Sequence, residues 1–349
     1  MPKARGTAIN PPNRFERLHV EPLDDSTELE PDLPDRLTQF FVDNSKSILS
    51  ENDSPDVPFT YSINPYRGCE HGCVYCYARA DHEYLGFSAG LDFESKILVK
   101  TEAPRLLQEA LSASNWNPQT ICLSGDTDCY QPAERRLQLT RQCLEVFAAY
   151  RNPVSIITKN ALVQRDIDLL KDLAHDNLVT VTMTITTLDD DLIRTLEPRT
   201  SRAGLRLSTI RTLADNGIPV GVSVAPIIPG LTDQEIPAIL YAAAENGARY
   251  AGYIILRLPH AVREVFMEWL ERELPLKAHK IRNRITDFRG GRVSNYEWGT
   301  RTRGKGPSAV AVRTLFEQAL RRSGLSSEKH ELSNHHFRIP LDRQLDLFH

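Results

Sequence analysis

The sequence predicts an α/β fold, and it favours an incomplete (β/α) barrel over a doubly wound sheet. Between about Phe59 and Trp269, short β-branched segments alternate with longer segments that have helical spacing. Strands that alternate with helices in this way form right-handed βαβ units around a parallel sheet. A short strand before Asn64 brings the number of units to about six, although periodicity alone does not separate the two architectures.

Length and composition indicate an ordinary folded protein. The 349 residues are 41% hydrophobic and 25% charged, which excludes global disorder and collagen-like repeats. The 42 Lys and Arg against 46 Asp and Glu give a net charge of −4, so any nucleic-acid surface must be a local patch. No apolar run is long enough for a membrane span, and Met1–Val20 has no apolar segment of the secretory type. Six cysteines in such a chain favour a metal site or a reactive thiol, and we expect a cytoplasmic location.

Four regions follow one another along the chain. Residues 1–58 are expected to form an arm, because Glu21–Asp35 holds seven acidic residues, three prolines and no Lys or Arg. Regular structure is expected from Phe59, and residues 59–274 form the predicted barrel. Residues 275–325 form a basic extension with a helix, and residues 326–349 form a polar tail.

The alternating pattern places the individual elements of the barrel. Asn-Gly pairs at 216–217 and 246–247 stand where helices are expected to end. The expected strands are Thr120–Leu123, Val154–Thr158, Val179–Thr184, Val220–Ala225 and Tyr253–Arg257. The expected helices are Leu137–Tyr150, Asp166–Ala174, Leu205–Asn216, Gln234–Asn246 and Val262–Leu270.

The extension after the barrel is strongly basic. Between Lys280 and Lys305 there are eight Lys or Arg and two acidic residues, a net charge of 8 − 2 = +6. Glycines and the aromatic residues Tyr296 and Trp298 are interleaved with these charges. A helix is expected over Ala309–Arg322, with Ser308 as its N-cap and Gly324 as its stop.

A short cysteine loop is the most informative segment for chemistry. Cys69, Cys73 and Cys76 have the spacing Cys-x3-Cys-x2-Cys. Three thiolates on one loop can hold three irons of an iron–sulfur cubane, which leaves the fourth iron open for chemistry. Two alternatives remain: a Cys3His zinc site completed by His71 or His82, or three buried, inert cysteines.

The loop resembles the signature of the radical S-adenosylmethionine (SAM) superfamily. Its flanks Asn64–Gly68 and Tyr75–Arg79, together with Gly125–Glu134, look like the spore photoproduct lyase-like branch of that family. The resemblance implies a partial (β/α)6 barrel and a [4Fe–4S] cluster bound by Cys69, Cys73 and Cys76. It also implies that SAM chelates the open iron and that one electron from a donor partner converts SAM to methionine and a 5′-deoxyadenosyl radical.

The same resemblance implies where SAM binds. The turn after the Thr120–Leu123 strand is expected to receive the SAM amino group, although an ordinary strand-to-helix turn is the alternative. Arg199 is preferred to Arg202 as the carboxylate ligand, because a guanidinium binds a carboxylate bidentately. The candidate cofactor-binding residues are Ser124, Gly125, Asp126, Thr127, Thr184 and Arg199, with Thr158 and Lys159 as a polar wall.

The remaining cysteines divide into two kinds. Cys122 and Cys143 fall within an expected strand and an expected helix, so both are predicted to be buried in the core. Cys129 falls in the turn after the strand, close to the expected chemistry. Because photoproduct lyases return a hydrogen atom from a cysteine, the resemblance makes Cys129 the candidate catalytic hydrogen donor.

Two features indicate partners. The basic segment Lys280–Lys305 suits a nucleic-acid backbone, with Tyr296 or Trp298 stacking on a base, whereas a solvated charged face is the alternative. Gln344–Phe348 resembles the peptide by which bacterial repair proteins bind the sliding clamp. The preferred hypothesis is therefore a radical SAM enzyme with lyase-like repair activity on nucleic acid. The alternatives are a radical SAM enzyme for a protein or small molecule, and a zinc-dependent nucleic-acid-binding module.

Overall fold

A seven-stranded sheet forms the centre of the protein. The computed structural model describes residues 5–15, 37–57, 59–291, 298–328 and 330–340. The strand order is β10-β9-β8-β7-β6-β3-β2, and every neighbouring pair is parallel except β2 with β3. The strands are β2 (Ser50–Glu51), β3 (Tyr61–Ile63), β6 (Ile121–Leu123), β7 (Val154–Thr158), β8 (Val179–Thr184), β9 (Val220–Ile227) and β10 (Tyr250–Ile255). Six parallel strands thus confirm the partial (β/α)6 architecture, and the sheet is not closed, because β2 and β10 are its edges.

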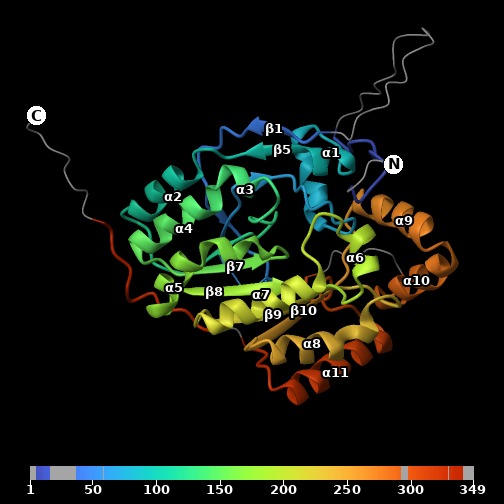
Figure 1. Cartoon of the computed structure of the whole chain (residues 1–349). Coiled ribbons are helices and arrows are strands. Elements are labelled where there is room, and N and C mark those ends of the chain that lie inside the picture. Colours follow the sequence, from blue (N-terminus) through green and yellow to red (C-terminus); the bar gives the residue numbers. More distant parts are fainter. Residues whose placement is uncertain (1–4, 16–36, 58, 292–297, 329, 341–349) are drawn as a thin grey trace, which may run out of the picture.

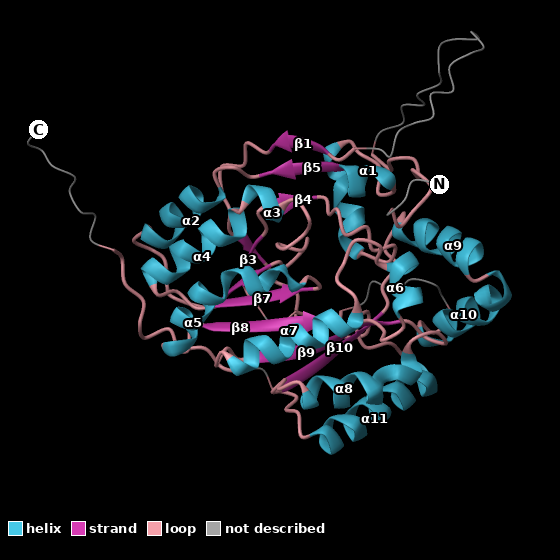
Figure 2. Cartoon of the chain, viewed as in Figure 1, coloured by secondary structure: helices cyan, strands magenta, loops and turns pink. Residues whose placement is uncertain are grey.

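Helices follow the strands and cover the sheet (Figures 1 and 2). The longer ones are α2 (Ala103–Ser112), α4 (Leu139–Tyr150), α5 (Ile167–His175), α7 (Ala203–Asp215), α8 (Ile236–Glu245), α9 (Val262–Glu273), α10 (Pro275–Phe288) and α11 (Gly306–Ser323). The shorter ones are α1 (Leu91–Ser95), α3 (Glu134–Leu137), α6 (Asp190–Leu196) and the 3-10 helices η1 (Tyr77–Leu85), η2 (Ala161–Asp166) and η3 (Asp233–Glu235). None of the described helices is both long and apolar enough to cross a lipid bilayer.

Among the described residues, the two largest of four apolar clusters contain most of the core. The main core lies between the sheet and α2, α4, α5, α7 and α8, with residues such as Phe147 and Leu213 fully buried. The second cluster packs α9 and α10 against the cysteine loop, through Val74, Phe266 and Trp269. Figure 2 shows β7 and β8 pointing towards the side on which α9 and α10 lie. The second cluster is therefore at the carboxyl ends of the strands, where α/β barrels place their active sites.

The predicted barrel elements agree closely with the observed ones. β7 and β8 have the predicted bounds, and β10 begins three residues before the expected strand. The Asn-Gly pairs end α7 and α8, since Asn216 and Asn246 are the C-caps and the following glycines have φ of +77° and +93°. Positive φ is costly for residues with a side chain, which explains glycine at both positions.

Three expectations outside the barrel are wrong. Regular structure does not begin at Phe59, because β1 (Gln39–Val42) and β2 precede it. β1 pairs with β5 (Lys96–Val99), which also pairs with β4 (Tyr66–Arg67) in a separate three-stranded sheet. Helix α11 begins at Gly306 rather than after Ser308, because Pro307 needs no backbone N–H partner in a first turn. The basic extension also contains α10 in addition to the one expected helix.

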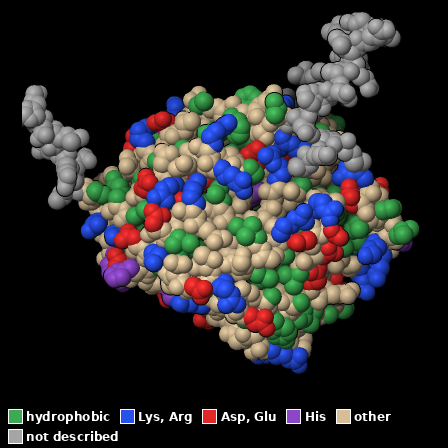
Figure 3. All heavy atoms as spheres, viewed as in Figure 1, with side chains coloured by type: hydrophobic (Ala, Val, Ile, Leu, Met, Phe, Trp, Pro, Cys, Tyr) green, Lys and Arg blue, Asp and Glu red, His purple; other side chains and the backbone are tan. Residues whose placement is uncertain are grey.

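The segment 299–302 contacts both edges of the open sheet. Asp56 lies in the loop between β2 and β3, at one edge, and accepts a hydrogen bond from Gly299 N at 2.7 Å. Asp56 also forms an ion pair with Arg301. Next to Arg301, Thr302 O accepts from Ile255 N of β10, at the other edge, at 2.9 Å. Elsewhere the charges are mixed: Figure 3 shows acidic and basic side chains interspersed over the face in view.

Candidate active site

The cysteine loop connects β4 to η1 and is held by a buried arginine. Cys69 and Cys73 are buried and Cys76 is half-buried. The guanidinium of Arg79 donates to the carbonyl oxygens of Gly72 at 3.0 Å and Cys73 at 2.8 Å. Arg79 also forms an ion pair of 2.5 Å with Glu94, and both side chains are fully buried. One guanidinium therefore fixes the backbone around Cys73.

Residues 5–15 pack against the same loop from outside. Glu94 accepts hydrogen bonds from the backbone N–H groups of Gly6 at 2.9 Å and Thr7 at 3.2 Å. A Cβ atom on Gly6 would lie 1.9 Å from the carbonyl oxygen of Gly72, so only glycine fits there. The expected arm thus contains a segment that is part of the folded site, and the acidic composition of Glu21–Asp35 gave no sign of it.

Gln131 holds the first cysteine from the other side. Its buried amide donates to Gly68 O at 3.1 Å and accepts from Glu70 N at 2.9 Å, so it spans Cys69. Gln131 belongs to the Gly125–Glu134 segment, but spacing in the sequence alone did not indicate this contact. The loop is therefore clamped at both ends before any cofactor binds.

The three thiols fit a cluster better than a single zinc ion. Burial raises the pKa of Cys76 to about 11, and burial and neighbouring negative charge raise the pKa of Cys69 and Cys73 further. Thiolates in this setting need a bound cation to compensate their charge. Among the described residues, no three His, Cys, Asp or Glu side chains converge on a point where one ion would bind. Cubane ligands bind different irons, so they need not converge.

The two histidines of the zinc alternative have different surroundings. His71 Nδ1 lies 3.4 Å from Asp128, and its Nε2 is 3.1 Å from Asn160 Nδ2. The ring of His82 packs against Phe87 and Phe93, with centroid distances of 5.3 and 5.6 Å. Burial lowers the pKa of His82 to about 4. His71 is therefore engaged through both ring nitrogens, whereas neither ring nitrogen of His82 has a hydrogen-bond partner in the described part of the chain, so His82 stays open as the fourth ligand of the zinc alternative.

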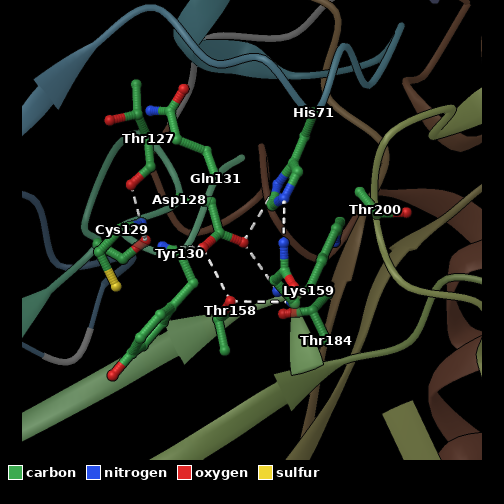
Figure 4. A network of polar contacts seen from close by, with 12 residues as sticks. His71, Thr127, Asp128, Cys129, Tyr130, Gln131, Thr158, Lys159, Thr184 and Thr200 are labelled. Carbon is green, nitrogen blue, oxygen red and sulfur yellow. Dashed lines mark hydrogen bonds and ion pairs between the residues drawn. The ribbon is translucent and has the colours of Figure 1, made fainter. Parts of the chain in front are cut away.

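Asp128 joins the cysteine loop to the ends of two strands (Figure 4). Its carboxylate accepts from Thr158 Oγ1 and from Lys159 N, each at 2.8 Å, and it faces His71. Burial opposes ionisation of Asp128, but His71 and these hydrogen bonds hold its pKa below the usual value. Asp128 is thus an anionic anchor for His71, a role that the sequence did not indicate.

The structure separates the four candidates in the turn after β6. Ser124 Oγ donates to Thr127 O at 2.7 Å, and Thr127 Oγ1 donates to Tyr66 O at 2.7 Å, so both hydroxyl groups stabilise the turn itself. A Cβ on Gly125 would lie 2.7 Å from Ser62 Cβ, which explains the glycine. Asp126 is different, because its buried Oδ1 has no hydrogen-bond partner in the described part of the chain.

Asp126 is therefore the group in this turn that is available to a ligand. Burial, with a further contribution from Asp81, raises its pKa to about 7. An ammonium group placed against the carboxylate would satisfy the orphan oxygen and favour ionisation. This is the position in which the sequence predicts the SAM amino group.

A second buried network holds Tyr75, the aromatic residue before Cys76. Tyr75 donates to Glu197, which is also paired with Arg206, and all three side chains are buried. Burial opposes ionisation of Glu197, but Arg206 lowers the pKa of this carboxyl to about 2. Arg206 also donates to Thr184 O at 2.9 Å, which ties the end of β8 to the network. Thr184 itself is buried at that strand end.

The two candidate arginines lie in different places. Arg199 forms an ion pair of 3.1 Å with Glu70 of the cysteine loop, and its N–H donates to His71 O. Arg202 donates instead to Asp190 O at 2.5 Å, and this contact is exposed. Arg199 is thus beside the loop, as the preferred role requires, although Glu70 holds its guanidinium in this structure.

The other cysteines are all fully buried. Cys122 and Cys143 belong to the core, as predicted, and the thiol of Cys129 is also part of the main apolar core. Figure 4 shows the Cys129 sulfur pointing away from His71 and Asp128. The role of Cys129 as hydrogen donor stays a prediction.

The family assignment follows from the sequence of this same region. Residues 63–241, which carry the cysteine loop, Asp126 and β8, match the family described as the Radical SAM superfamily. The chain belongs to this superfamily. Radical SAM enzymes use a [4Fe–4S] cluster and SAM. The donor set of three thiols and one orphan carboxylate is compatible with both.

Relatives and solved structures agree with this assignment. An uncharacterised protein of Mycobacterium tuberculosis is 37% identical over 221 residues, or 63% of this chain and 65% of that protein. The match therefore spans less than two thirds of that relative. An uncharacterised protein of Methanocaldococcus jannaschii is 30% identical over 66% of this chain and 82% of its own length.

Among solved structures, the fold resembles spore photoproduct lyase. The complex with dinucleoside spore photoproduct has a TM-score of 0.59 at 18% identity, covering 82% of this chain and 81% of that one. A mutant with bound AdoMet and the same dinucleoside has a TM-score of 0.58 at 17% identity and the same coverage. At this level of identity the similarity establishes the fold.

Proposed function

We propose that this radical SAM enzyme acts on nucleic acid, with lyase-like repair chemistry on a damaged base. The observation that carries the proposal is the cysteine loop with its three thiols, together with the turn after β6, in which Asp126 has an unpartnered carboxylate oxygen. Cys69, Cys73 and Cys76 would hold the [4Fe–4S] cluster. When bound, the cluster supplies the electron that cleaves SAM reductively.

This chain's own residues then bind and orient the cosubstrate. Asp126 would receive the SAM ammonium group, and Arg199, once released from Glu70, would receive the carboxylate. Lys159 follows β7, with its Nζ 3.2 Å from Ala225 O and 3.9 Å from Glu197. Tyr75 and the helices α9 and α10 exclude water behind the loop.

Nucleic acid is the proposed substrate for two reasons. The similar solved structures hold a dinucleoside photoproduct, and the segment after β10 brings several arginines to the open edge of the sheet. The alternative is a radical SAM enzyme for a protein or small molecule. Cys129 remains the proposed hydrogen donor, although its burial means that the product radical would have to reach it through a change in the β6 turn.

The cluster assignment is tested by anaerobic reconstitution with iron and sulfide analysis. We expect about four irons and four sulfides per chain in the wild type, and loss of both in Cys69→Ala, Cys73→Ala or Cys76→Ala, because a cubane then has too few anchors. Cys143→Ala is the matched control, since this thiol is buried in the core and should not affect iron content. Stoichiometric zinc without sulfide would refute the assignment.

The chemistry is tested separately by product analysis. With a strong reductant, the reconstituted wild type should convert SAM to 5′-deoxyadenosine and methionine. If S-adenosylhomocysteine were the only nucleoside product, the protein would be a methyltransferase and the proposal would be wrong.

A further inference from the structure

Three guanidinium groups gather beside the open edge of the sheet. Arg257 lies two residues after β10, Arg289 follows α10, and Arg301 lies in the segment that runs along the β10 edge. Arg289 Nη1 donates to Arg301 O at 2.5 Å, and its Nη2 donates to Leu256 O. The three residues come from separate elements, yet the backbone contacts bring them into one cluster.

This cluster carries more positive charge than the protein neutralises. Among the described residues, Asp56 is the one carboxylate paired with it, through Arg301. Arg289 Nη1 and Nη2 donate to neutral carbonyl groups, and Arg257 has no carboxylate within ion-pair distance in the described ranges. Burial, then repulsion by Arg257, lowers the pKa of Arg289 to about 10. Burial, then repulsion by Arg301, lowers the pKa of Arg257.

Partly buried charge of one sign is unfavourable unless an anion compensates it. Among the described residues, three arginines and the one aspartate within ion-pair distance give 3 − 1 = +2, and Asp81 acts on Arg257 only from beyond that distance. The overall charge of the chain is negative, at −4, so a general basic surface does not account for the cluster. The arrangement indicates a binding site for an anionic group that presents more than one oxygen atom to the arginines.

Tyr77 connects this cluster to the reaction centre. The Arg257 guanidinium lies over the Tyr77 ring, 5.5 Å from its centroid. Tyr77 directly follows Cys76, and its hydroxyl donates to Gly125 O at 2.6 Å, next to Asp126. Tyr77 is 41% exposed, so a ligand can reach part of this residue. An anion on Arg257 would therefore be close to whatever reacts beside Cys76.

The position in the sequence separates this site from the SAM machinery. All three arginines lie after residue 241, outside the part that matches the superfamily. SAM is common to the superfamily, whereas the substrate differs between its members, so a site built outside the shared part is expected to recognise substrate. Trp298, 56% exposed and 6.0 Å from the Arg301 guanidinium, adds an aromatic surface on which a base can stack.

We propose that Arg257, supported by Arg289 and Arg301, binds a backbone phosphate of the nucleic-acid substrate and so positions the base next to it beside Cys76. This inference rests on the proposed function, because it requires that the substrate carry a phosphodiester. A planar guanidinium binds two phosphate oxygens at once, and the Tyr77 ring keeps its plane in a fixed orientation.

The test compares Arg257→Gln with a matched control in reconstituted enzyme. The control is Arg105→Gln on α2, because Arg105 is exposed and already paired with Glu102 at 2.8 Å and with Glu109. Binding of a fluorescein-labelled single-stranded DNA 12-mer is followed by anisotropy over a series of salt concentrations. SAM affinity is measured by equilibrium dialysis on the same preparations, together with iron and sulfide content.

We expect Arg257→Gln to weaken DNA binding about tenfold at low salt and to reduce the slope of log Kd against log salt by about 0.7, the value for one phosphate contact on a single strand. SAM affinity and iron content should not change, and Arg105→Gln should behave as the wild type. Arg257→Lys should recover part of the affinity, because an ammonium keeps the charge but loses the bidentate contact. This variant also serves if the glutamine variant fails to fold.

Other outcomes overturn the proposal in distinguishable ways. Unchanged DNA binding in both Arg257 variants would refute the phosphate site and leave the proposed function intact. Weaker SAM binding with unchanged DNA binding would show that Arg257 takes the SAM carboxylate instead. A wild type that cleaves SAM but binds no DNA at any salt concentration would refute the nucleic-acid substrate, and with it this site.

Discussion

At the scale of single residues, we expect the Asp126 carboxylate to make SAM binding depend on pH. Burial and Asp81 raise its pKa to about 7, above the usual value, so it is protonated at lower pH in the free enzyme. A protonated carboxyl loses its attraction for the SAM ammonium group. We therefore expect SAM affinity to fall by up to about tenfold for each pH unit below 7. Equilibrium dialysis between pH 5.5 and 8.5 measures this directly.

Two variants check that Asp126 is the titrating group. Asp126→Asn should bind SAM weakly at every pH, and its SAM affinity should no longer change near pH 7. Asp81→Asn should move this change in SAM affinity to lower pH, because it removes a negative charge that raises the pKa of Asp126. If SAM affinity in Asp126→Asn kept the pH profile of the wild type, the pH dependence would belong to another residue.

The buried pair of Arg79 and Glu94 makes a second prediction at this scale. Glu94→Gln leaves the guanidinium of Arg79 without its counter-charge in a fully buried position. Loss of one partner of a buried ion pair costs about 3–5 kcal/mol, so the free energy of unfolding in urea should fall by that amount. Glu102→Gln, which breaks an exposed pair with Arg105, should cost less than about 1 kcal/mol. Equal losses in the two variants would contradict the argument.

Sequence analysis can identify candidate site residues whose chemistry shows in local spacing. The three thiols, and Asp126 after a strand, could be found in this way because each signal lies within a few neighbouring residues. Gln131, Glu197 and Arg206 could not, because their partners are distant in sequence or have ordinary side chains. Their roles depend on a packed arrangement that only the fold reveals.

At the scale of elements, α9 and α10 pack against the cysteine loop and support it. Trp269 of α9 is fully buried in the cluster that contains Val74 and Tyr75. We expect Trp269→Ala to lower the free energy of unfolding by about 3–5 kcal/mol, because it leaves a large cavity. The same change should lower the iron content after reconstitution, since the loop loses its support.

Trp269→Phe is the appropriate comparison for this prediction. It keeps most of the ring and removes an indole N–H that has no hydrogen-bond partner among the described residues. Its stability should be much closer to that of the wild type. A Trp269→Ala protein with reduced stability but full iron content would show that the loop holds its shape without α9.

The accuracy of the sequence-based fold follows from the strength of each local pattern. β7 and β8 were predicted to the residue, because each is a largely buried segment rich in β-branched residues and bounded by polar turns. β1 was missed because it is four exposed residues whose pairing partner, β5, lies more than fifty positions later. Helix α10 was obscured by its basic residues, which face solvent while Ile281 and Ile285 are buried.

At the scale of the whole molecule, the tail adds a prediction about recruitment. Gln344–Phe348 lies outside the described residues, so its role as a clamp-binding peptide stays a prediction from sequence. We expect the wild-type protein to bind a purified bacterial sliding clamp with roughly micromolar affinity, as short linear peptides do. Replacing Leu347 and Phe348 by Ala should abolish this binding and leave SAM cleavage unchanged. Loss of both activities would instead assign the tail a structural role.

The contact between Gly6 and Gly72 has a consequence for how related chains are compared. The aligned superfamily region begins at residue 63, yet a backbone stretch ahead of it touches the loop so closely that a methyl group at position 6 would overlap a carbonyl oxygen. A homologue with any larger residue at that point must lead its N-terminal segment along another path. A Gly-Thr pair whose backbone N–H groups can reach the carboxylate of Glu94 is therefore a marker that can be recognised in a sequence. It separates relatives whose N-terminal segment covers the cysteine loop in this way from relatives that share only the barrel.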